Sequence, residues 1–211
     1  MKILNLYSGI GGNRKLWAGH EVTAVELNPE IAKIYSDFFP DDTMIVGDAH
    51  QYLLDHFKEF DFIWSSPPCP SHSRARFWGC SDNGRILPVY PDMKLYQEIL
   101  LLTHYAKCQW VVENVKPFYT PLIEGKEIGR HLYWSNFYIP AIESKDADIN
   151  RGRIDEWQEL HGFDISEYKL STRRDQVLRN CVSPETGLHI LNMATGTIPP
   201  IQEGLFKGVL K

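Results

Sequence analysis

The chain has 211 residues, a length that suits one large domain or one domain with a small annex. Hydrophobic residues make up 43% and charged residues 23%, which is typical of a globular protein with a real core, and no apolar run reaches the length of a membrane span. The net charge of −5 excludes little, because an acidic chain can still carry one basic face. The four cysteines form no C-x-x-C pair and no run with histidine, so we expect neither a disulfide framework nor a metal site.

Strand and helix patterns alternate through the first 115 residues. Apolar runs bounded by turn residues predict strands over residues 2–7, 21–27, 43–48, 60–66, 109–115 and 130–139. Helical periodicity and capping residues predict helices over residues 11–19, 28–39, 51–60, 91–107, 153–162 and 183–196. This alternation is typical of an α/β fold with an open, mostly parallel sheet and helices on both faces.

Residues of chemical interest lie where the predicted strands end, which is where such sheets bind ligands. The turn "SGIGG" follows the first strand, and Gly9, Gly11 and Gly12 let its backbone bend tightly. Its spacing does not match the dinucleotide fingerprint G-x-G-x-x-G, so a plain turn is the alternative. Glu26 ends the second strand, where a carboxylate can accept the hydroxyls of a ribose. Asp48 ends the third, where it can accept an exocyclic amine or cap a helix. Together these residues predict a site for an adenosine-containing cofactor.

The stretch "SSPPCPSHSRARFWG" places Cys69 directly after two prolines and before a polar, basic loop. Pro67 and Pro68 fix two backbone angles ahead of the thiol, and a nucleophile needs such positioning. Glu113 ends the fifth strand, next to the fourth in this topology, and is a candidate proton donor. Most free cysteines are small core residues, and many strand ends carry an ordinary carboxylate, so neither residue decides the function alone.

The order of "LYSGIGG", "VELNPE", "GDAH", "PPCP" and "VVENV" resembles the cytosine carbon-5 methyltransferases of DNA. The resemblance covers residues 1–139 and resumes near residues 171–195. It implies the Rossmann-like fold of class I methyltransferases that depend on S-adenosylmethionine. This molecule would be the cofactor, and double-stranded DNA would be the partner. The resemblance divides the chain into a catalytic and cofactor-binding core at 1–139, a reduced target-recognition insert at 140–170 and a C-terminal segment at 171–211 that returns to the core.

The chemistry of the family explains why it uses these residue types. Cytosine carbon 5 is too electron-poor to be methylated unaided, so the resemblance implies that the Cys69 thiolate adds to carbon 6 while Glu113 protonates ring nitrogen 3. Carbon 5 then accepts a methyl group, and loss of its proton releases the cysteine. A stacked base cannot reach this geometry, so the family flips the cytosine out of the duplex. Arg130 is the candidate contact to the cytosine carbonyl, with a surface arginine as the alternative.

The resemblance carries further roles over, position by position. The cofactor would be held by the glycine turn, the next two strand ends, the proline pair and the late segment "NCV". The residues are Tyr7, Gly9, Ile10, Gly11, Gly12, Glu26, Leu27, Asp48, Ala49, Pro67, Asn180 and Val182. Nucleic acid would be contacted by the loop after the cysteine and by a later basic segment, through Ser71, Ser73, Arg74, Arg76, Arg151 and Arg153.

The chain departs from the family pattern at several places. Tyr7 stands where the family usually has Phe, Pro70 replaces the Gln after the cysteine, and Arg179 replaces the Gly before Asn180. The segment 140–170 stands where relatives carry a large target-recognition domain, and it is shorter than the smallest self-standing domain. We therefore expect a short or relaxed sequence preference, with affinity mainly from phosphate contacts and room for an accessory protein that reads the target.

Three alternatives stay open at this point. The substrate could be tRNA cytosine, although the Cys-Phe-Thr motif of tRNA-modifying relatives has only a faint echo in "KPFYT". The transferred group could differ from plain methyl. The chain could also be a non-catalytic module that binds nucleic acid or a partner, but such modules commonly lose the nucleophile or the glycine turn.

The short length and the N-terminal sequence suggest the type of source and the cellular location. We expect a compact enzyme of a phage, a mobile element or a restriction-modification system. The start "MKILNLYSG" enters a strand pattern without a signal peptide, so we expect it in the cytoplasm of a bacterial or phage-infected cell, without membrane or metal.

Overall fold

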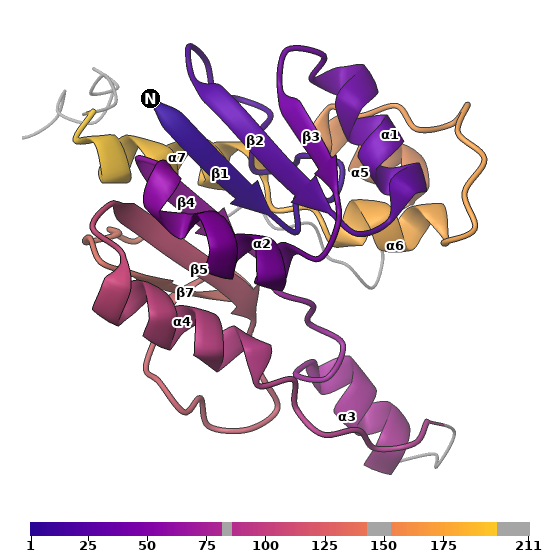
Figure 1. Ribbon diagram of the computed structural model, residues 1–211. Coiled ribbons are helices and arrows are strands. Elements are labelled where there is room, and N and C mark those ends of the chain that lie inside the picture. Colours follow the sequence, from indigo (N-terminus) through magenta and orange to yellow (C-terminus); the bar gives the residue numbers. More distant parts are fainter. Residues whose placement is uncertain (82–85, 143–152, 198–211) are drawn as a thin grey trace, which may run out of the picture.

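A computed structural model of the chain describes residues 1–81, 86–142 and 153–197. Its sheet has the strand order β3-β2-β1-β4-β5-β7-β6 (Figure 1). The parallel strands are β1 (Lys2–Leu6), β2 (Glu21–Glu26), β3 (Thr43–Val46), β4 (Phe62–Ser65) and β5 (Gln109–Val115). β7 (His131–Ser135) runs antiparallel beside β5, and β6 (Lys126–Ile128) pairs antiparallel with β7 at the edge. The mostly parallel sheet confirms the predicted α/β fold.

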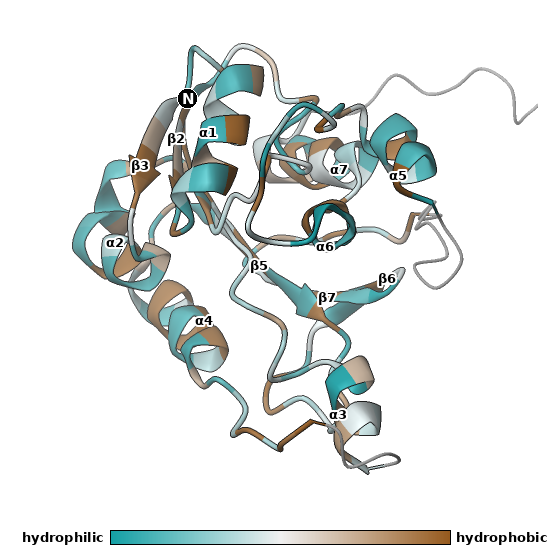
Figure 2. Ribbon diagram, turned by 90° about the vertical axis from the view of Figure 1, so that its right-hand side faces the viewer, coloured by the Kyte–Doolittle hydropathy of each residue, from teal (hydrophilic) through white to brown (hydrophobic). Residues whose placement is uncertain are grey.

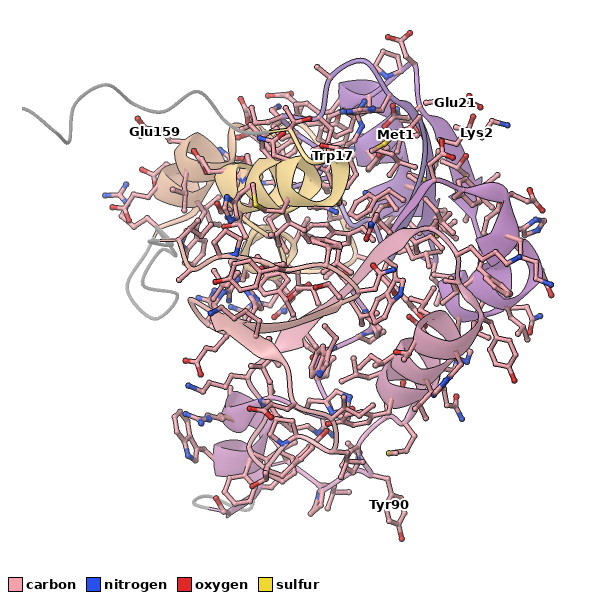
Figure 3. All side chains as sticks on the ribbon, turned by 90° about the vertical axis from the view of Figure 1, so that its left-hand side faces the viewer. Met1, Lys2, Trp17, Glu21, Tyr90 and Glu159 are labelled. Carbon is pink, nitrogen blue, oxygen red and sulfur yellow. The ribbon has the colours of Figure 1, made fainter. Side chains whose placement is uncertain are left out.

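Helices cover both faces of this sheet (Figure 2). α2 (Ala49–His56), the short 3₁₀ helix Phe57–Glu59 and α4 (Lys94–Tyr105) contribute to one apolar cluster with the sheet. α7 (Pro184–Thr195) and Trp17 pack together in a second cluster on the other face (Figure 3). α1 (Pro29–Phe38), α5 (Ile154–His161) and α6 (Arg174–Arg179) share a third cluster. α5, which lies in the predicted insert, thus packs with α1 of the core; the proposed domain boundaries stay a prediction.

Local sequence signals set the ends of the helices. The Asn28 side chain accepts a hydrogen bond from the amide of Glu30 at the start of α1, and Ser183 caps α7 in the same manner. A proline follows each cap, where its fixed φ angle suits the first turn. α7 ends at Gly196 in the left-handed conformation, which glycine adopts without steric cost.

The structure corrects four sequence predictions. The helix predicted over 11–19 is wrong, because Gly11 has a φ of 89° and the following amides bond three residues back in successive turns. The strand predicted over 130–139 ends at Ser135, since the Asn136 side chain then bonds the backbone of the neighbouring chain segment at Trp110 and Cys108. The pattern predicts neither α3 (Arg74–Ser81), which buries no residue and so has no apolar periodicity, nor the six-residue α6.

α3 stands apart from the body of the molecule (Figures 1 and 2). It occupies the region after Cys69 that the sequence predicts to be a long loop. Among the helices in the described parts of the chain, none is long and apolar enough to cross a membrane.

Candidate active site

The carboxyl ends of β4 and β5 bring the predicted nucleophile and the predicted acid together. The two strands pair in parallel register up to Ser65 and Val112. Glu113 is therefore level with the residue that follows β4, at the start of the segment leading to Cys69. Glu113 is buried, whereas Cys69 is half-buried. This is the arrangement expected from the order of the strands.

Hydrogen bonds to backbone carbonyls hold the chain on both sides of Cys69. Before it, the Asn114 side chain donates to the carbonyl of Pro67 at 2.8 Å, which ties the proline segment to β5. After it, the carbonyl of Cys69 accepts from the amides of His72 and Ser73 at 3.0 and 3.1 Å. Where the sequence predicts a loop directly after the cysteine, the structure has a tight turn that leads into α3.

Two charged side chains act on the Cys69 sulfur in opposite directions. Burial raises the pKa of the Cys69 thiol to about 11, and the Glu113 carboxylate raises it as well, whereas the Arg130 guanidinium lowers it. Arg130 precedes β7, and its Nη2 donates to the carbonyl of Arg179 at 2.5 Å. The thiol is thus protonated at neutral pH, and forming the reactive thiolate requires a change in its surroundings.

The glycine turn is tied to the end of β2 through Glu26. Its Oε2 accepts from the amide of Gly9 at 3.1 Å and its Oε1 from the amide of Asn28 at 2.9 Å. Each carboxylate oxygen keeps a second lone pair that can accept a ligand hydroxyl. Next to Glu26, Leu27 is 70% exposed, and the buried Ser8 hydroxyl has no partner among the described residues. An unpartnered buried hydroxyl and an exposed apolar side chain fit a ligand with polar and apolar parts.

The three glycines of the turn differ in the space around them. A Cβ at Gly11 would lie 2.4 Å from the Phe39 ring, and one at Gly12 would lie 2.5 Å from the carbonyl of Val182. These two glycines therefore let the turn pack closely against α1 and the C-terminal segment. Gly9 has a φ of 55°, and a Cβ there would meet nothing within 4 Å. Of the three, Gly9 alone borders open space that a ligand could enter.

The remaining predicted cofactor residues differ in what they can offer a ligand. Ile10 and Ala49 are buried in apolar clusters, which leaves their backbones for contact. Asp48 caps α2, and its exposed carboxylate lies 3.6 Å from Lys94 Nζ. Asn180 is exposed at the end of α6, where its amide oxygen accepts from a side chain one turn earlier.

A buried carboxylate that the sequence pattern does not single out lies beneath these strand ends. Glu98 of α4 is 1% exposed, and its Oε1 accepts from the Tyr7 hydroxyl at 2.6 Å and lies 2.8 Å from His50 Nδ1. Its Oε2 accepts from the Ser65 hydroxyl at 2.5 Å. The bond to Glu98 raises the pKa of His50. Glu98 thus joins the ends of β1 and β4 to the start of α2, and holds Tyr7, whose φ of 55° is unusual for a bulky residue.

Comparison with known proteins agrees with this geometry. Residues 1–121 match the family of C-5 cytosine-specific DNA methylases. The chain belongs to this family. Membership in this family implies S-adenosylmethionine as the cofactor.

Two curated proteins to which this chain is similar are tRNA (cytosine(38)-C(5))-methyltransferases. The protein of Spodoptera frugiperda is 35% identical over 80 residues, which are 35% of this chain and 24% of that protein. The protein of Rattus norvegicus is 27% identical over 131 residues, 56% of this chain and 31% of that protein. The matched part of this chain therefore spans less than a third of the length of either relative. Among solved structures, methyltransferase EhMeth of Entamoeba histolytica covers 93% of this chain and 98% of its own with a TM-score of 0.53, and at 13% identity this shows a shared fold alone.

Four residues predicted to contact nucleic acid make hydrogen bonds within or next to the α3 segment, which is the stretch that follows Cys69 and includes α3. Ser71 and Ser73 accept from backbone amides through their hydroxyls, at 2.9 and 3.2 Å. Arg74 and Arg76 donate to backbone carbonyls at 3.4 and 3.1 Å. These contacts fix the shape of the segment next to Cys69.

Two large aromatic side chains on and after α3 are exposed. Trp78 on α3 is 58% exposed, and Tyr90, which points away from the body of the molecule in Figure 3, is 96% exposed. Arg153 is exposed at the start of α5 and pairs with Asp155, while Arg151 lies outside the described residues.

The charges around Cys69 predict how it reacts with an alkylating agent. We expect its alkylation by iodoacetamide to rise with pH toward a midpoint near the thiol pKa of about 11. Glu113→Gln removes a negative charge near the sulfur and should move the midpoint to lower pH. Arg130→Gln removes a positive charge and should move it to higher pH. Mass spectrometry of the Cys69 peptide measures the midpoint, with the half-buried Cys108 as internal reference. Two unchanged midpoints would show that neither charge lies close to the sulfur.

Proposed function

We propose that this chain transfers a methyl group from S-adenosylmethionine to carbon 5 of cytosine in DNA, through a covalent bond to Cys69. The observation that carries the proposal is the half-buried Cys69 thiol in the segment that follows β4, within electrostatic reach of Glu113 near the carboxyl end of β5. A nucleophile and an acid on adjacent strand ends can act on two atoms of one ring.

The neighbouring strand ends would hold the cofactor, which supplies an electrophilic methyl group when it is bound. The open space at Gly9 admits the ligand, and Glu26 would accept its ribose hydroxyls. Leu27 would cover one face of the adenine, and the Asp48 carboxylate would accept from the adenine amine. Glu98 would keep this side of the site in shape through Tyr7.

The protein side chains carry the proton and bond changes on the base. The Cys69 thiolate adds to carbon 6 of the flipped cytosine, while Glu113 gives its proton to ring nitrogen 3, so that no negative charge accumulates in the ring. Arg130 favours the thiolate and would contact the cytosine carbonyl. Once carbon 5 carries the methyl group, loss of its proton to water restores the ring double bond and expels the Cys69 thiolate, and ring nitrogen 3 returns its proton to Glu113.

The segment around α3 would contact the nucleic acid next to the flipped base. It continues directly from Cys69, carries Arg74 and exposes Trp78 and Tyr90. Aromatic side chains stack on bases of any sequence, and arginine pairs with phosphate without reading sequence. These contacts, together with the reduced insert at 140–170, support a short or relaxed sequence preference.

A second candidate substrate is cytosine in tRNA. The observation that favours it is that the curated relatives described above are tRNA methyltransferases, although this chain spans only part of their length. The catalytic chemistry is the same for both substrates, because it involves only the cytosine ring.

Oligonucleotides that contain 5-fluorocytosine test the reaction and the substrate together. Fluorine at carbon 5 cannot leave as the proton does, so the Cys69–carbon 6 bond persists after methyl transfer. We expect a cofactor-dependent covalent adduct with duplex DNA, visible as a shifted band on a denaturing gel. An adduct formed with tRNA alone would favour the second candidate, and no adduct with any substrate would indicate a non-catalytic module. Mass spectrometry of an unmodified product then identifies the transferred group.

A further inference from the structure

A buried histidine lies against the catalytic carboxylate. His131 Nε2 is 3.4 Å from Glu113 Oε1, and each side chain is 8% exposed. This distance is slightly beyond the range of an ordinary N–H···O hydrogen bond. Catalytic hydrogen bonds are often long before the substrate binds and shorten in the reacting complex.

The strand register explains why these two side chains meet. In the antiparallel pair of β5 and β7, Val115 lies opposite His131 and Glu113 lies opposite Tyr133. Residues two apart on a strand share a face, so His131 and Glu113 are diagonal neighbours on one face of the sheet. The His131 ring also lies edge-on to the Tyr133 ring, 6.4 Å between centroids. The histidine is therefore held in place by elements of the sheet itself.

Arg130, the residue before His131, contacts a different part of the site. Arg130 donates to the carbonyl of Arg179, in the segment that returns to the glycine turn. Two consecutive residues where β7 begins thus contact different parts of the site. Arg130 bonds the C-terminal segment, and His131 lies against the Glu113 carboxyl. The sequence indicates only Arg130, because the register of "GRHLYW" on the sheet decides which side chain reaches Glu113.

We propose that His131 is a positioning residue for the proton transfer by Glu113; this inference rests on the proposed function. In the protonated form of Glu113 that the transfer uses, His131 Nε2–H donates to Oε1 and the carboxyl proton lies on Oε2, where it can pass to ring nitrogen 3 of the cytosine. As the proton passes from Oε2 to the ring nitrogen, Glu113 becomes a carboxylate. A carboxylate accepts a stronger hydrogen bond than a neutral carboxyl, so the contact to His131 favours the transfer at the moment it occurs. No other proton or electron moves.

The test uses two replacements of nearly equal size. His131→Gln keeps an N–H donor that cannot titrate, whereas His131→Met has none. We expect the Gln variant to stay within about 10-fold of the wild-type kcat, and the Met variant to lose about 10- to 100-fold in kcat with little change in KM, as for a hydrogen bond to a charged group. His161→Met serves as the control, because His161 is a buried histidine on α5, and it should keep the wild-type kcat. Thermal unfolding of all variants checks that they fold.

A double-mutant cycle separates positioning from a structural role. In a Glu113→Gln background the carboxylate is gone, so His131→Met should cause little further loss of kcat. Losses that multiply in the cycle, or equal kcat values for the Gln and Met variants, would overturn the inference while the wild type remains active. If the wild type forms neither product nor fluorocytosine adduct, the proposed function fails and this inference fails with it.

Discussion

Replacing Cys69 by alanine is expected to lower cytosine methylation by a factor on the order of 10⁴ or more, while S-adenosylmethionine still binds. Without the thiolate, carbon 6 gains no nucleophile and carbon 5 stays too electron-poor to accept a methyl group. The contacts that place residue 69 are made by backbone groups, including its own carbonyl, so the alanine variant should keep the fold around it. Initial rates with labelled methyl donor measure the loss, and titration calorimetry measures cofactor affinity.

A second cysteine provides the matched control for this variant. Cys108 is also half-buried but precedes β5, at the opposite end of the strand from Glu113. Cys108→Ala should keep the wild-type rate. Methylation by the Cys69→Ala protein at a normal rate would refute the covalent mechanism.

Replacing Glu98 by alanine is expected to lower the free energy of unfolding by about 3–5 kcal/mol, as for removal of one member of a buried charged network. The change leaves the hydroxyls of Tyr7 and Ser65 and the His50 ring without their shared acceptor, and it opens a cavity next to the sheet. Because Tyr7 directly precedes the glycine turn, cofactor affinity should fall as well. Urea unfolding followed by fluorescence measures the stability, and calorimetry measures the affinity.

Two further variants make the Glu98 result specific. Glu98→Gln keeps one acceptor oxygen and the shape of the side chain, so its loss of stability should be smaller than that of the alanine variant. Glu159→Ala changes an exposed glutamate on α5, labelled in Figure 3, and should stay within about 0.5 kcal/mol of the wild type. If Glu98→Ala were as stable as Glu159→Ala, the network would have no structural role.

The sequence by itself determined the α/β class, the strands of the sheet other than the three-residue β6, and the strand ends near which Glu26, Cys69 and Glu113 lie. These follow from local information, namely apolar runs, turn residues and the parallel order that collects carboxyl ends at one edge. The motif order was also sufficient to indicate the family, because its residues keep their spacing along the chain.

Only the tertiary structure decided which side chains support those residues. Glu98 is one carboxylate in an apolar helix until α4 packs on the sheet and brings it to Tyr7, His50 and Ser65. Likewise, Gly11 and Gly12 are needed for packing against α1 and the C-terminal segment. Such contacts join residues far apart in the chain, and their partners depend on strand register and on how helices pack, neither of which leaves a periodic signal in the sequence.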